Sequence, residues 1–227
     1  MVGLGGLVAV EDPWIRWSWV ERHTDDIVER TIAHLELTGI TLLIGLVIAL
    51  PLGIACHRWR RVYPTVLGVA GVIYTVPSLA LFALLIPFTG LSRTTSIIPL
   101  VSYTLLILVR NVVAGLQSVP EDVRESATGM GFSPLRQLLR IELPLALPAI
   151  MAGIRITSVT TIGLVTITSL IGEESLGLLI LDGLYRDFRT PLVVGTVCIV
   201  TLSALADLGF LGLEKALAPW ARRRRGT

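Results

Sequence analysis

Residues 120–144 read PEDVRESATGMGFSPLRQLLRIELP and form a polar stretch between two long apolar runs. The stretch opens with two acidic residues, which favour a helix from Glu121 to about Met130 because they lie at the positive end of its dipole. Gly129 and Gly131 predict the exit from this helix, since glycine adopts positive φ without strain. The first half of the stretch therefore predicts one short helix that ends in a tight turn.

The second half of the stretch carries the signals of another helix start. Ser133 is a favoured N-cap residue, and Pro134 follows at the first helical position. Pro144 and Pro148 then mark the start of the next apolar run. A helix–turn–helix held at a membrane surface is a shape that a soluble partner protein could bind.

The composition indicates an integral membrane protein. The chain has 227 residues, of which 53% are hydrophobic and 16% charged, and its mean hydropathy is +0.76. These values lie outside the range of soluble domains. At this length we expect one all-α bundle of five transmembrane helices and no fused soluble domain. Cys56 and Cys198 lie in or beside apolar runs, which favours a packing role over a metal site or a disulfide.

Five apolar runs are each long enough to cross a bilayer core, which needs about 20 residues. Pro77 lies in the middle of the second run and predicts a kink in that helix. Between the fourth and fifth runs, residues 172–190 predict an outer loop with a short surface or re-entrant helix. The expected spans cover about 35–55, 64–88, 95–116, 149–171 and 191–213.

The segment before the first span, residues 1–34, is expected to be extracytoplasmic and interfacial. Trp14, Trp17 and Trp19 are typical of the aromatic belt at a membrane surface. His23 and His34 have no partners at metal-ligand spacing, so we expect both to be ordinary surface histidines.

The distribution of basic residues predicts the orientation. Three arginines at 57–61, three on the polar stretch, and Lys215 with the four-arginine run at 222–225 must share one side of a five-span bundle. The opposite side carries six arginines mixed with acids. The positive-inside rule therefore places the N-terminus outside and the C-terminus in the cytoplasm. The basic tail, residues 214–227, is interpreted as an anchor to anionic lipid rather than as a nucleic-acid site.

The polar stretch resembles the EAA loop of ABC-importer permeases. The similarity rests on the spacing of Glu125-Ser126-Ala127, Gly131 and Ile141-Glu142-Leu143-Pro144. In that family the loop, here residues 117–148, is the coupling helix that docks on a cytoplasmic ATPase. The resemblance implies that Glu125 contacts an arginine of the ATPase, that Gly131 makes the turn, and that Pro144 sets the angle of the fourth span. The implied coupling residues are Glu125, Ser126, Ala127, Gly129, Gly131, Phe132, Ser133, Ile141 and Pro144.

Further segments are similar to the permeases of osmoprotectant importers, which carry glycine betaine, choline and carnitine. The similarity covers about residues 35–213 and includes segments 50–54, 76–81 and 142–155, with a departure at 172–177. It implies an ABC ATPase dimer, a second similar permease and an extracytoplasmic substrate-binding protein as partners, in a prokaryotic plasma membrane. The chain has no Gly-x-x-x-x-Gly-Lys-Ser/Thr phosphate loop. ATP and Mg²⁺ are therefore expected on the partner ATPase, with no cofactor and no catalysis on this chain.

Two other functions remain open at this point. One is an ABC-importer permease for another small solute, such as methionine or another amino acid. The other is a channel or carrier that does not use ATP, which is disfavoured because no internal repeat and no membrane-centre acid suited to ion coupling are visible.

Two groups of residues within the spans are candidates for particular roles. Tyr74, Pro77, Ser78 and Tyr103 are polar or helix-breaking groups that could line a substrate path, or could serve only in packing and interhelical hydrogen bonds. Arg155 and Asp207 are ionisable residues near the cytoplasmic ends of the fourth and fifth spans, and we expect them to face each other as a structural pair.

Overall fold

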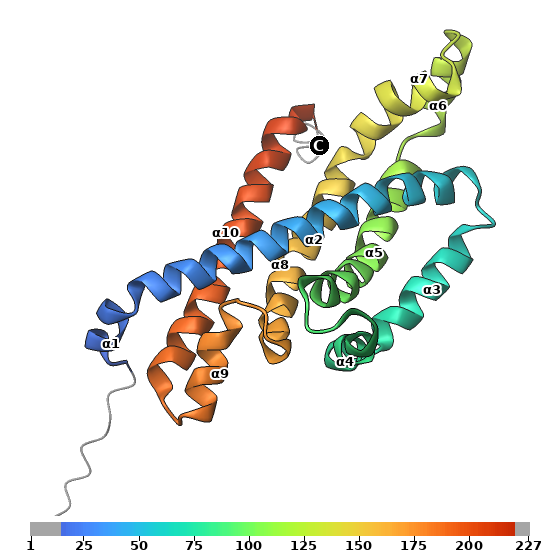
Figure 1. The fold of residues 1–227 in the computed structure, drawn as a ribbon. Coiled ribbons are helices and arrows are strands. Elements are labelled where there is room, and N and C mark those ends of the chain that lie inside the picture. The colour runs from blue at the N-terminus through green and yellow to red at the C-terminus, as the bar shows by residue number, and fades with distance from the viewer. Residues whose placement is uncertain (1–14, 221–227) are drawn as a thin grey trace, which may run out of the picture.

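The computed structural model describes residues 15–220, and within this range every regular element is a helix. The long helices α2, α5, α8 and α10 are apolar enough to cross a membrane (Figure 1). A bent pair of shorter helices, counted as one more span, brings the total to as many as five. Their bounds are α2 Thr24–Arg58, α5 Arg93–Gln117, α8 Leu143–Thr168 and α10 Arg189–Leu217.

Shorter helices connect these spans. The segment between the fourth and fifth spans contains a short helix, as the sequence predicts. The shorter elements are α1 Trp17–Arg22, α3 Tyr63–Thr75, α4 Ser78–Thr89, α6 Glu121–Gly129, α7 Pro134–Gln137, a π turn Leu138–Glu142, a 3₁₀ turn Ser169–Ile171 and α9 Gly177–Tyr185. Residues of the tryptophan-rich segment up to Trp14, and the four-arginine run, lie outside the described range.

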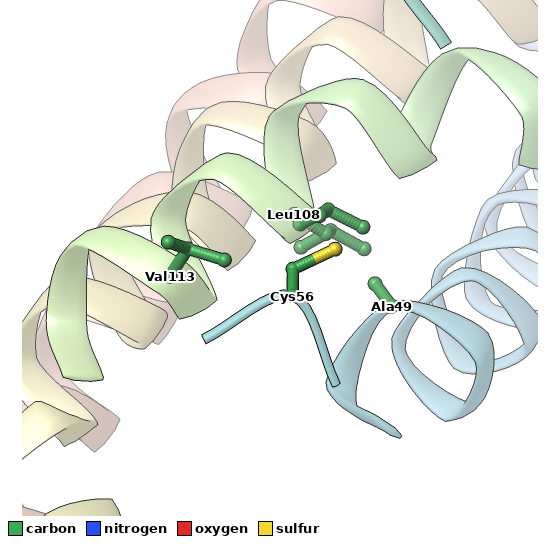
Figure 2. Packing of buried hydrophobic residues seen from close by; sticks show 5 residues of the cluster. Ala49, Cys56, Leu108 and Val113 are labelled. Atoms are coloured by element: carbon green, nitrogen blue, oxygen red, sulfur yellow. The ribbon is translucent and has the colours of Figure 1, made fainter. Parts of the chain in front are cut away.

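The centre of the bundle is the contact between α2 and α5. Helix α2 presents small residues at Gly45, Ala49 and Gly53, which lets the two backbones approach closely. A Cβ atom at Gly45 would lie 2.3 Å from the Thr104 Oγ1 atom of α5. Figure 2 shows the same interface further along α2, where Cys56 packs on α5 as a small apolar residue.

Helix α8 packs against both members of this pair. A Cβ at Gly153 would lie 2.5 Å from the Asn111 Cβ atom on α5. On the α2 side, the His34 Nε2 atom lies 3.0 Å from the Ile162 carbonyl oxygen. These two contacts join the first, third and fourth spans into one core.

His34 is buried, which corrects the expectation of a surface histidine. Its side chain is 0% exposed, because α2 starts at Thr24 and carries residue 34 into the bundle. The predicted first span, about 35–55, is thus part of one 35-residue helix that starts at Thr24. His23, by contrast, is half-buried and stacks on Trp19 with ring centroids 4.2 Å apart.

The second span is broken, which corrects the expectation of one kinked helix. Helices α3 and α4 meet at an angle of 94°. Pro77 lacks an N–H, and its ring disfavours helical geometry at the preceding residue. Val76 accordingly has extended backbone angles of φ −67° and ψ 129°, and the helix stops there.

Helix α10 covers α8 from the outside and is tied to it by an ion pair. The Arg155 guanidinium donates to both Asp207 carboxylate oxygens, with 2.9 Å for each N···O distance. This is the pairing that the sequence predicts, and its two parallel bonds fix the geometry as well as the charge. Glu214, two turns further along α10, places an oxygen 3.8 Å from the same guanidinium.

The α2–α5 contact gives a direct test of the packing. Gly45→Ala forces a Cβ to 2.3 Å from Thr104 Oγ1, so we expect the free energy of unfolding to fall by about 1–3 kcal/mol. The measurement is the apparent melting temperature of the purified protein in detergent. Gly39→Ala is the matched control on the same helix, because its Cβ meets nothing within 4 Å. Equal melting temperatures for the two variants would contradict the close approach.

Candidate functional site

Helices α6 and α7 project from one end of the bundle (Figure 1). Helix α6 runs from Glu121 to Gly129, so the predicted first helix is confirmed. Gly131 has φ +77° and makes the turn, also as predicted. Gly129, in contrast, is the last residue of the helix and does not have positive φ, so the turn depends on Gly131 alone.

The second helix starts where the sequence predicts but does not end before the fourth span. Ser133 is the N-cap residue in extended geometry, although its side chain makes no capping hydrogen bond. From Pro134 the chain continues through the π turn at 138–142 directly into α8. Pro144 lies inside this run, directly after the π turn, and its missing N–H removes one hydrogen bond of the helix. The hairpin and the fourth span are therefore one continuous run of helix.

The α6–α7 hairpin has one side turned to the bundle and one side uncovered. Ala127 is fully buried, whereas Glu125 and Ser126 beside it are exposed. No hydrogen bond or ion pair engages the Glu125 carboxylate within the described residues, which leaves it available to another molecule. Apolar side chains at the tip are also exposed, by 55–68%: Met130, Leu135 and Leu139.

The remaining predicted coupling residues support the hairpin from within. Phe132 and Ile141 are half-buried. The Arg136 guanidinium lies 4.6 Å from the centre of the Phe132 ring, within the range of a cation–π contact. The Phe132 N–H donates to the Ala127 carbonyl at 3.1 Å and closes the turn between the helices.

Arg124 fastens the hairpin to the bundle, and sequence reasoning did not identify it. Its guanidinium donates to the Leu116 carbonyl at the end of α5. It also lies 3.5 Å from a Glu142 carboxylate oxygen at the start of α8 and 3.4 Å from Glu121. His57 Nε2 of α2 is 3.5 Å from the same group. One side chain on α6 thus contacts the ends of three spans.

Glu142 is the other centre of this network. Its carboxylate accepts a hydrogen bond from Gln137 Nε2 at 3.0 Å, and Gln137 in turn accepts from Thr128 of α6 at 3.3 Å. The side chains of Arg124 and Glu142 are only 16% and 12% exposed. Because both charges are largely withdrawn from water, removing one partner leaves the other poorly solvated. The only hint in the sequence was an arginine directly before Glu125 and a glutamate directly before Leu143-Pro144.

A second feature lies at the break in the second span. All four residues predicted for a substrate path line one cavity of about 540 Å³: Tyr74, Pro77, Ser78 and Tyr103. Its other wall comes from α8, at Thr160, Gly163, Leu164 and Ile167. The Tyr103 hydroxyl donates to the Val76 carbonyl, which holds the two sides of the break against α5.

An all-helical membrane bundle with a projecting helical hairpin and a cavity at a broken span has the architecture of a transport permease. The chain belongs to the family described as the binding-protein-dependent transport system inner membrane component, whose model matches residues 42–219.

Relatives of this chain cover nearly its whole length. It is 32% identical to the choline transport system permease protein OpuBB of Bacillus subtilis, over 91% of this chain and 95% of that protein. It is 36% identical to the carnitine transport permease protein OpuCB of Listeria monocytogenes, over 91% and 94%. The osmoprotectant import permease protein OsmW of Salmonella typhimurium is 35% identical, over 83% and 90%.

The fold also matches solved structures. An inward-facing structure of the MetNI methionine ABC transporter superposes with a TM-score of 0.79 at 24% identity, over 87% of this chain and 98% of that one. An amino acid ABC transporter gives a TM-score of 0.68 at 18% identity, over 90% and 98%. At these identities the likeness establishes the shared fold.

The Arg124–Glu142 contact is expected to hold α6 in place. Arg124→Gln and Glu142→Gln should each speed hydrogen exchange of the α6 backbone amides, measured by mass spectrometry. The double variant should be hardly worse than either single one, with a coupling energy of about 0.5–3 kcal/mol.

Arg140→Gln is the control for this cycle. It removes an exposed arginine from the same segment, so the exchange of α6 should stay at the wild-type rate. Additive effects of the Arg124 and Glu142 changes would show that the two groups act independently.

Proposed function

We propose that this chain is the membrane-spanning permease of an ATP-driven importer for quaternary-amine osmoprotectants such as glycine betaine, choline and carnitine. The observation that carries the coupling role is the projecting α6–α7 hairpin, with Glu125 exposed beside the apolar tip. The substrate class rests on the transport activities for which relatives at 32–36% identity over most of the chain are named.

The hairpin would dock on an ABC ATPase dimer that binds ATP and Mg²⁺ and performs the hydrolysis. This chain then supplies no catalytic residue and no cofactor site. Closure of the ATPases on nucleotide displaces the hairpin, and the continuous run from Pro134 to Thr168 passes that displacement to the fourth span. Glu125 is positioned to meet a basic group on the ATPase, and Met130, Leu135 and Leu139 supply the apolar part of the contact.

Two further partners complete the proposed importer. A second, similar permease would cover part of the exposed bundle, and an extracytoplasmic binding protein would deliver the substrate. The assembly would span a prokaryotic plasma membrane five times per permease, counting α3 and α4 as one broken span. The N-terminus would lie outside, and the α6–α7 hairpin and C-terminus would lie in the cytoplasm, as the arginine distribution predicts.

Uptake in proteoliposomes tests the coupling role. The vesicles contain this chain with its partner permease, ATPase and binding protein, and radiolabelled glycine betaine is added outside. Uptake is expected only with ATP inside. Glu125→Lys should lower it at least tenfold, because reversing one charge of a desolvated pair costs several kcal/mol. Arg140→Glu serves as a second charge reversal on the hairpin, away from Glu125.

The outcomes separate the alternatives. Robust uptake without ATP would overturn the importer proposal in favour of a channel or carrier. ATP-dependent uptake of methionine or another amino acid, with none of betaine, choline or carnitine, would keep the mechanism and overturn the substrate class.

Cysteine labelling tests the orientation. In a background with Cys56 and Cys198 replaced by alanine, Arg61→Cys and Tyr185→Cys place single thiols at exposed positions at the two ends of the bundle. A membrane-impermeant maleimide added to intact cells should label position 185 and not position 61. Labelling of position 61 alone would reverse the proposed orientation.

A further inference from the structure

The cavity at the broken second span has an aromatic corner. The rings of Tyr74 and Tyr103 lie 5.7 Å apart between centroids and are inclined by 76°, so they form two walls at nearly a right angle. Tyr103 is 5% exposed and is held by its hydrogen bond to Val76, whereas Tyr74 is 43% exposed. One ring is therefore fixed, and the other presents free surface to the cavity.

The backbone at the break is largely hydrogen-bonded already. The Ile73 carbonyl accepts from the Val76 N–H, the Val72 carbonyl from the Thr75 hydroxyl, and the Val76 carbonyl from the Tyr103 hydroxyl. The carbonyl end of α3 also meets the N–H end of α4 here, so the two helix dipoles oppose each other. The lining contains no Asp, Glu, Lys, Arg or His. The cavity thus offers aromatic faces to a cation without a full countercharge.

This combination matches a particular chemical group. A quaternary ammonium carries its charge on a shell of methyl groups and donates no hydrogen bond, so it is attracted to aromatic faces within about 6 Å of the ring centre. A primary ammonium donates three hydrogen bonds and needs oxygen acceptors, whereas the charge of this cavity's aromatic faces suits a cation that donates none; the lining hydroxyls are those of Thr75, Ser78, Thr160 and the two tyrosines. A site without a carboxylate also binds weakly, as a transit site must if the substrate is to leave again.

We propose that this cavity is a transient binding site for the quaternary ammonium group of the transported substrate. Tyr74 supplies the contacting π face, and Tyr103 is the fixed second wall. The permease itself then selects for methylated ammonium compounds, in addition to any selection by the binding protein. This inference rests on the proposed transport function and names where in the chain the substrate pauses.

Direct binding is the test. The permease–ATPase complex is purified without the binding protein, and choline is added as the probe. Saturation-transfer NMR should show magnetisation passing from the protein to the N-methyl protons of choline. Tyr74→Leu keeps bulk but removes the π face, so the signal should weaken about tenfold, the loss of about 1.4 kcal/mol of cation–π attraction. Tyr74→Trp should keep the signal or strengthen it.

A second variant tests the same cavity independently, in case Tyr74→Leu fails to fold. Gly163 lies on the α8 wall, and a Cβ there meets nothing within 4 Å. Gly163→Leu therefore has room for its Cβ and adds side-chain bulk to the cavity wall, and leucine also favours helix more than glycine does. This variant should abolish the choline signal. Phe88→Leu is the matched control, because Phe88 is an aromatic residue on α4 that is 84% exposed and lies outside the cavity lining.

The uptake assay separates a failure of the cavity assignment from a failure of the proposed transport function. Wild-type choline signal retained in both Tyr74→Leu and Gly163→Leu would overturn the cavity assignment. So would a wild-type complex that imports choline with ATP but shows no choline signal, and in that case the proposed function would stand. A wild-type importer that transports no quaternary amine would overturn the proposed substrate class and the cavity assignment together.

Discussion

The close contact between α2 and α5 is the constraint on which the other parts of this molecule depend. Glycines at 45 and 53 let the two helices approach to a distance that no side chain at these positions would allow. In a membrane, where apolar side chains gain nothing by leaving lipid for protein, such close packing supplies much of the association energy. Helix α8 packs on this pair, α5 carries Tyr103 to the cavity, and the end of α5 offers the Leu116 carbonyl that receives Arg124.

Local signals predicted those features that depend on a few neighbouring residues. The acidic start of α6, the glycine turn at 131 and the N-cap position of Ser133 are set by backbone preferences within one or two turns, and the structure has all three. The pairing of Arg155 with Asp207 was also predictable, because an isolated charge in a span is costly and these two residues lie near the same ends of successive spans.

What the sequence did not predict depends on contacts between distant segments. Burial of His34 requires Ile162 of α8 beside it, and hydropathy alone cannot show that α2 includes the eleven residues before the apolar run. The difference between a kink and a 94° break at Pro77 depends on whether a neighbour stabilises the separated ends, as Tyr103 does here. The Arg124–Glu142 contact joins residues eighteen positions apart across a turn, so no helical spacing reveals it.

The unbroken helical run from Pro134 to Ile171 carries α7 of the hairpin at one end and the α8 wall of the cavity towards the other. Its 38 residues correspond to a length of about 57 Å at about 1.5 Å per residue. A tilt of about 5° about its middle moves each end by about 2.5 Å, and in opposite directions. The middle lies near Gly153, where α8 presses most closely on Asn111 of α5. That contact is placed as a pivot, with the α6–α7 hairpin on one side of it and the cavity wall at 160–167 on the other.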